Sequence, residues 1–255
     1  MKDEKVTFKS ASQAAQFGFS IGSKIIESID GKVPNDVIQK LIADKDESSE
    51  FKQFVSEITE RILNIKSDPW KREKEKVAKF TRETLGFRTE IDWTNTVIPV
   101  TEIADMQHFE FVPAAITEDE LFAIYEKLFG KDNVYKAYKS ISKAIKTQQS
   151  RPVGDYCVLH RGGQEPDAEH LNKSYDDFSG DGKKYMTPKE GIIAALRFRV
   201  ETGNMYDVKG VTRFHALDAD GDAMLMRRND DGRFFISGSN RDYRFSGCGP
   251  REVSF

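Results

Sequence analysis

Residues 211–251 read VTRFHALDADGDAMLMRRNDDGRFFISGSNRDYRFSGCGPR, and this stretch decides the predicted fold. Short segments of strand-forming residues are separated by runs of Asp, Asn and Gly, which favour tight turns. Together with the last five residues of the chain, they predict four strands, at 212–217, 223–228, 233–237 and 251–255. We therefore expect an antiparallel meander at the C-terminus. Phe234 and Ile236 alternate with Phe235 and Ser237, so the first pair is expected to face the core.

The same stretch has an unusual composition. It contains no Lys, Glu or Gln, although the whole chain has 24, 20 and 8 of them, and an even distribution would place about eight of these residues there. It keeps seven Arg and six Asp. Asp, Asn, Ser, Gly, Arg, His, Tyr, Phe, Cys and Ala can all arise when the adenines of an Asn codon are replaced, whereas Lys, Glu and Gln cannot. A run of hairpins, which favours Asp, Asn, Gly and Ser at turns, is the structural alternative.

Bulk properties limit the classes of protein that are possible. The 255 residues are enough for two domains, and 38% hydrophobic residues are enough to form real cores. The net charge of −3 provides no overall positive field, so we expect no nucleic-acid partner. Two cysteines cannot form a disulfide framework. Because the sequence has neither a signal-peptide pattern nor a long apolar run, we expect synthesis in the cytoplasm and no membrane span.

Apolar periodicity divides the chain near residue 86. Residues 1–86 are predicted to form an all-α N-terminal domain, with helices at 12–29, 34–42, 48–63 and 70–85. These helices could attach the protein to a partner or mediate self-association.

Residues 87–255 are predicted to form an α+β domain. A strand is expected at 108–112, and the capping box Thr117-Glu-Asp-Glu120 should begin a helix that ends at Gly130. Further predictions are a helical stretch at 134–147, a strand at 156–160 and a polar loop at 161–185. A second capping box, Thr187-Pro-Lys-Glu190, should begin a helix that ends at Gly203.

The order strand, two helices and C-terminal antiparallel meander resembles a C-type lectin-like domain, in which the first and last strands pair and the loops form one exposed face. Together with the composition of 211–251, it resembles a variable protein of a diversity-generating retroelement. Two local strings add to the resemblance, Leu159-His-Arg-Gly-Gly163 and Pro250-Arg-Glu-Val-Ser-Phe255, while the family's usual Gly-Phe-Arg-like ending is absent. The resemblance implies a ligand-binding C-terminal region whose Asn-type codons are rewritten by an error-prone reverse transcriptase.

Outward-facing residues of 211–251 are the candidate binding site. Substitutions at turns change folding stability by about 0.5 kcal/mol or less, and Tyr, Ser, Asn, Asp, Gly and Arg suit adaptable binding surfaces. A broad surface built from turns suits a protein ligand better than a small molecule in a deep pocket. The residues expected to contact the ligand are His215, Asp218, Asp220, Asp222, Phe235, Ser237, Ser239, Asn240, Asp242, Tyr243, Phe245, Ser246 and Cys248.

Other functions remain open. One is an enzyme on the fold of the formylglycine-generating relatives, although we predict no catalytic residues, because no third group orients His215 beside Cys248. Another is a virion or assembly protein without a variable site. We expect no cofactor and no metal. Asp218, Asp220 and Asp222 have the spacing of the first calcium ligands of an EF-hand, but the later Gly and Glu are missing. A second group matches no standard zinc spacing, namely His160, Asp167, Glu169 and His170.

Overall fold

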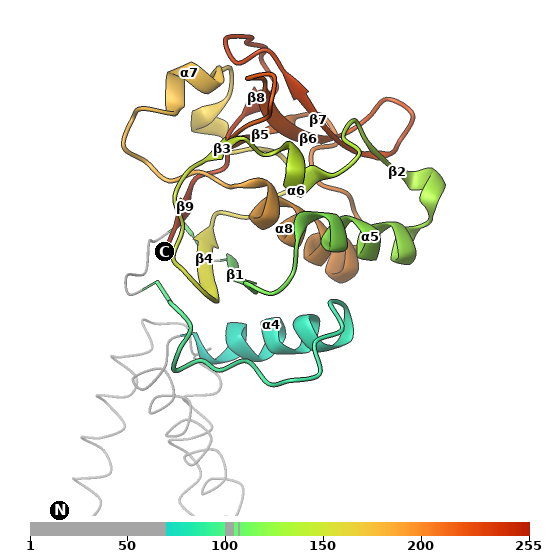
Figure 1. The fold of residues 1–255 in the computed structure, drawn as a ribbon, viewed down its shortest axis with the longest axis vertical. Helices are drawn as coiled ribbons and strands as arrows, with labels where there is room; N and C mark the ends of the chain where they lie inside the picture. Colours follow the sequence, from blue (N-terminus) through green and yellow to red (C-terminus); the bar gives the residue numbers. More distant parts are fainter. Residues whose placement is uncertain (1–69, 100–104, 107) are drawn as a thin grey trace, which may run out of the picture. The chain divides into compact units, whose positions relative to one another are not determined.

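The computed structural model describes residues 70–99, 105–106 and 108–255. The helices predicted at 12–29, 34–42 and 48–63 lie outside the described residues. Trp70–Phe255 forms one compact unit with an α+β fold (Figure 1). Among the described residues, no helix has the length and apolar character needed to cross a membrane.

The strands of this unit form two sheets. The smaller sheet has the order β1-β4-β9, from strands His108–Val112, Tyr156–His160 and Val253–Ser254. The larger sheet has the order β2-β7-β6-β5-β3, and β8 pairs with β5 off this path. Its strands are β2 (Val134–Lys136), β3 (Thr147–Gln148), β5 (Val211–Leu217), β6 (Ala223–Arg228), β7 (Phe234–Ser239) and β8 (Cys248–Gly249).

The predicted meander is confirmed for three of its four strands, whereas the fourth, predicted at 251–255, is reduced to Val253–Ser254 (β9) and pairs with β4 in the smaller sheet. Strands β5, β6 and β7 are antiparallel neighbours joined by the two predicted turns. Phe234 and Ile236 lie in the core, at 1% and 0% exposure, as their alternation with Phe235 and Ser237 predicts.

The expected pairing of the first and last strands is wrong for the described strands. The first, β1, pairs with β4, and the last, β9, pairs with the opposite edge of β4, so β4 lies between them. The apolar run of β4 is buried along its whole length, as a central strand with neighbours on both sides requires.

Three predicted helices are confirmed. Helix α4 (Lys71–Glu83) packs against β1, where Trp70 stacks on Phe109 with 5.3 Å between ring centroids. Helix α5 (Glu118–Phe129) and helix α8 (Pro188–Thr202) both begin with the predicted capping boxes. Since α4 packs against β1, the expected domain boundary after residue 86 falls inside the compact unit.

The helical stretch predicted at 134–147 is wrong. This segment begins with β2, which pairs in parallel with β7, continues with the short helix α6 (Ile141–Ala144) and ends in β3. The Asp119 carboxylate accepts hydrogen bonds from the backbone N–H groups of Ile141 and Ser142 at 3.0 and 3.2 Å. A tertiary cap and a strand partner therefore override the local helical pattern. The polar loop at 161–185 also contains short helical turns, Ala168–His170 and α7 (Tyr175–Phe178).

Helices α5 and α8 lie side by side and cover one face of the six-stranded sheet (Figure 1). The sheet contributes Phe214, Ala216, Met224, Met226, Phe234 and Ile236 to this core. We call the opposite face of the six-stranded sheet the outer face. It carries the alternate residues of the same strands, so it is built largely from residues 211–251.

Candidate ligand-binding face

The outer face is covered along β5 and over Leu225 of β6 and Ser237 of β7, and it is accessible around Arg227, Phe235 and Tyr135. Over β5, the segment around α7 packs rings of Tyr175, Phe178 and Tyr185 around His215, with centroid distances of 5.5, 5.8 and 6.4 Å. Beside it, Cys248 forms a buried cluster with Val211 and Leu225. A ligand can therefore reach the outer face only where this covering ends.

Four residues of the expected contact set are buried, and the structure removes them from the candidate site. His215 is enclosed by rings, and burial lowers its pKa, so the neutral imidazole is favoured. The Asp218 carboxylate is used within its own turn, where it accepts the N–H groups of Asp220 and Asp222, both at 3.0 Å. Ser237 and Cys248 are also buried. Because they are buried, these four side chains are not available to a ligand.

The other nine residues are accessible. Five side chains are exposed, namely Asp220, Asn240, Asp242, Tyr243 and Ser246, and four are partly buried, namely Asp222, Phe235, Ser239 and Phe245. Most of them lie in the loop at residues 240–246 or on β7 beside it.

Ion pairs and a buried arginine hold the 240–246 loop in place. Arg241 and Arg244 pair with Asp176 and Asp177 of α7. The fully buried Arg213 also holds the loop, because its guanidinium donates to the backbone carbonyls of Asn240 and Arg241 at 3.3 and 3.4 Å. The loop therefore projects its other side chains from a fixed base.

A row of stacked side chains crosses the open part of the outer face. Arg227, Phe235 and Tyr135 face one another in register on β6, β7 and β2. The rings of Tyr135 and Phe235 are parallel, with centroids 5.2 Å apart and an angle of 8° between them. The guanidinium of Arg227 lies 5.4 Å from the Phe235 centroid, and that of Arg233 lies 5.4 Å from the Tyr135 centroid. Stacking of this kind fixes large side chains without burying them completely.

This row continues into the loop. Phe245 packs against the Val211, Leu225 and Cys248 cluster together with Phe235. The ring centroids of Tyr243 and Phe245 are 5.7 Å apart. Tyr243 is 55% exposed and Tyr135 is 44% exposed. Exposed aromatic rings with neighbouring arginines are the residue types that dominate binding energy in protein interfaces.

Sequence reasoning missed three members of this face, Tyr135, Arg227 and Arg233. Tyr135 fell in a segment predicted to be helical, so its position on an edge strand was not visible. Arg227 lies in a predicted strand and faces Phe235 across the sheet. Alternation along β6 would have placed Arg227 on the outer face if the sequence had shown which strand pairs with β6.

One grouping of the described residues has the geometry for a metal ion. Ligand atoms of Asp167, Glu169 and His170 lie within 4.8 Å of one another. Arg161 already pairs with Asp167 at 3.1 Å and with Glu169 at 2.9 Å, and His170 contacts Glu252 at 2.9 Å. A cation would therefore compete with a guanidinium for both carboxylates. Among the described residues, Asp218, Asp220 and Asp222 do not form a second grouping with the geometry for a metal ion.

Neither cysteine has the surroundings of a thiolate nucleophile. Cys157 and Cys248 are both free and buried. Burial raises the pKa of each thiol above its ordinary value. The neutral thiol therefore dominates at neutral pH.

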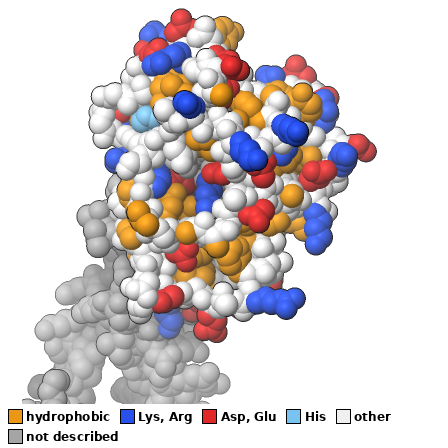
Figure 2. All heavy atoms as spheres, viewed as in Figure 1, with side chains coloured by type: hydrophobic (Ala, Val, Ile, Leu, Met, Phe, Trp, Pro, Cys, Tyr) orange, Lys and Arg blue, Asp and Glu red, His pale blue; other side chains and the backbone are white. Residues whose placement is uncertain are grey.

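Charge on the surface is mixed. Figure 2 shows acidic and basic side chains interspersed over the viewed face, without a uniformly positive area. This distribution does not favour a phosphate backbone as the ligand on that face.

Comparisons of the chain with protein-family models, with curated proteins and with solved structures found no match. Function is therefore inferred from the residues of this chain.

Proposed function

We propose that the chain is a variable, ligand-binding protein of a diversity-generating retroelement, and that it binds a protein ligand through the outer face and the 240–246 loop. The observation that carries this proposal is the distribution of exposure within residues 211–251. Nine of the thirteen expected contact residues are exposed or partly exposed. They surround scaffold residues of the same stretch that are fully buried, among them Phe234, Ile236 and Arg213. A stretch built in this way tolerates substitution on one side and resists it on the other.

The chemistry of the accessible residues supports protein recognition. Tyr135, Phe235, Tyr243 and Phe245 supply aromatic area that is already held in place by stacking. Aromatic rings lose little conformational entropy on binding, while Ser, Asn and Asp adapt their hydrogen bonds to different partners. A fixed aromatic centre with a polar surround matches the usual composition of a protein interface.

We also propose that the fold is C-type lectin-like over residues 87–255. Support comes from the two strings that carry the sequence resemblance, because they contact each other. Leu159 and His160 of β4 pair with Ser254 and Val253 of β9. The Arg251 guanidinium donates to the carbonyls of Gly162 and Gly163 at 3.1 and 3.3 Å. In this proposal β4, rather than β1, is the strand that receives the end of the chain.

The DNA beside the gene tests the retroelement part of the proposal. We expect a near-copy of codons 211–251 close to a reverse-transcriptase gene. Differences between the two copies should fall at adenines of Asn-type codons for the accessible residues. If the DNA beside the gene contains neither the near-copy nor a reverse-transcriptase gene, the retroelement part of the proposal is refuted. The exposed aromatic face would then have to be tested as an ordinary binding surface.

A further inference from the structure

The six-stranded sheet ends in an edge that lies beside the candidate ligand-binding face. Strand β2 is the terminal strand, with β7 as its neighbour in the sheet. Beyond its last residue, the N–H of Ala137 donates to the carbonyl of Ile236 at 2.9 Å. Because alternate residues of a parallel strand point to the same neighbour, the N–H of Lys136 points away from β7. The N–H of Val134 donates to the carbonyl of Lys131, so the N–H of Lys136 is the donor that β2 offers to another strand on that side.

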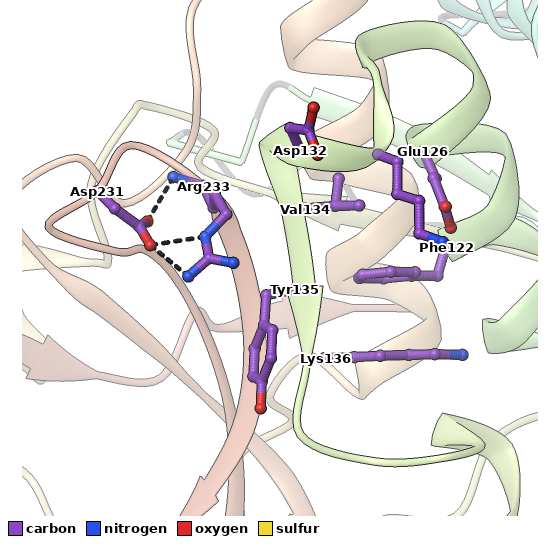
Figure 3. Close-up of a pocket in the computed structure, with 9 residues that line it drawn as sticks. Phe122, Glu126, Asp132, Val134, Tyr135, Lys136, Asp231 and Arg233 are labelled. Carbon is purple, nitrogen blue, oxygen red and sulfur yellow. Dashed lines mark hydrogen bonds and ion pairs between the residues drawn. The ribbon is translucent and has the colours of Figure 1, made fainter.

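A hollow of about 620 Å³ opens along this edge, and all three residues of β2 line it (Figure 3). Phe122 of α5 lies on one side of β2, and Tyr135 and Arg233 lie on the other. Side chains of an extended strand point alternately to its two sides. A strand added to β2 would therefore place successive side chains against Phe122 and against Tyr135.

The charges in the hollow indicate one feature of the added strand. Lys136 pairs with Asp119 at 2.8 Å, and Arg233 pairs with Asp231. Within the described part of the chain, the carboxylates of Glu126 and Asp132 have no ion-pair or hydrogen-bond partner, and Lys131 is the one other cation that lines the hollow. The lining itself carries three carboxylates and three cations, but Lys136 is paired with Asp119, which lies outside the lining, so Glu126 and Asp132 share one remaining cation, Lys131. A basic side chain on the occupant would supply the missing positive charge.

We propose that an extended segment of the protein ligand adds to β2 as a further strand and places a Lys or Arg side chain beside Glu126 and Asp132. This inference rests on the proposed function, because it describes how the same ligand is held. Main-chain hydrogen bonds to β2 do not depend on ligand sequence. The β2 edge then supplies a constant part of the binding, while the accessible residues of 211–251 supply the specificity.

Peptides selected for binding test this proposal. The probe is a phage-displayed library of random nine-residue peptides, selected on the full chain. The tightest peptide is then synthesised in three forms: unmodified, N-methylated at alternate residues on one edge, and N-methylated on the other edge. Loss of two main-chain hydrogen bonds should weaken binding about tenfold. We expect this loss for one N-methylated form only, because a strand pairs with β2 through one edge, and we expect a basic residue in the selected sequence.

Protein variants locate the binding. The double variant Glu126→Gln with Asp132→Asn should weaken the unmodified peptide at least about fivefold, since charged contacts are the stronger ones. The matched control Glu75→Gln removes an exposed carboxylate on α4 and should bind as the unaltered chain does. Equal binding of all three peptide forms, or a library without a binder at β2, overturns the strand addition. Peptides that lose binding with Tyr243→Ala but respond neither to N-methylation nor to the double variant would leave the proposed function intact and reject this inference.

Discussion

Arg251 ties the end of the chain to its scaffold, and replacing it with Met tests that role. Its guanidinium is 1% exposed and pairs with Asp207, which is fully buried, at 2.9 Å. The same group donates to Thr212 Oγ1 at 2.9 Å and to the carbonyl of Gln164 at 3.0 Å. Arg251→Met leaves a buried carboxylate without its partner, and such a loss costs about 3–5 kcal/mol. At about 2–4 °C per kcal/mol, the expected fall in Tm is about 6–20 °C.

Chemical and thermal denaturation followed by circular dichroism would measure this loss. The double variant Arg251→Met with Asp207→Asn separates the charge pair from packing. Asn keeps an oxygen for Thr212 and tolerates the left-handed backbone at position 207, where φ is 53°. We expect the double variant to lose less stability than the sum of the two single variants. A single variant within about 1 kcal/mol of the unaltered chain, or strict additivity in the double variant, would refute the reasoning.

Other predictions concern the two sides of the sheet and the buried polar groups. Phe234→Ala should cost about 3–5 kcal/mol of unfolding free energy and Phe235→Ala less than half as much, because only the first ring is fully buried; equal losses would contradict the assignment of the two faces. Burial lowers the pKa of His215 in the folded chain, so as the pH falls the imidazole is protonated in the unfolded chain before it is protonated in the folded chain. Stability should therefore fall as the pH drops below about 6.5, and His215→Phe should make that fall shallower in denaturation curves measured from pH 8 to pH 5. Cys157 and Cys248 should react slowly with a thiol reagent at pH 8 in the native chain and rapidly in denaturant, and rapid native labelling would show that the burial is wrong.

Local signals were sufficient for much of the fold. The capping boxes at Thr117 and Thr187 mark the starts of α5 and α8, because each satisfies backbone donors that any helix must satisfy. Turn residues and alternation likewise predicted the β5–β6–β7 meander. These features depend on neighbours within a few residues, which a single sequence displays directly.

Pairings between distant segments were not visible in the same way. Residues 134–136 became strand β2 because β7, a hundred residues later, is available as a parallel partner. The covering of β5 depends on the rings around α7, and this covering buries His215, which strand alternation alone would expose. Arg213 and Arg251 look like surface residues in the sequence, yet both are buried because distant oxygen atoms accept from them.

Sequencing many copies of this gene from related genomes is the most direct test of the central claim, which is that residues 211–251 combine a changeable outer surface with a fixed scaffold. We predict that substitutions concentrate at the accessible positions, Asp220, Asp222, Phe235, Ser239, Asn240, Asp242, Tyr243, Phe245 and Ser246. The buried residues Arg213, Phe214, Phe234, Ile236 and Arg251 should stay unchanged. Substitutions that fall equally on both groups, or evenly along all 255 codons, would contradict the account.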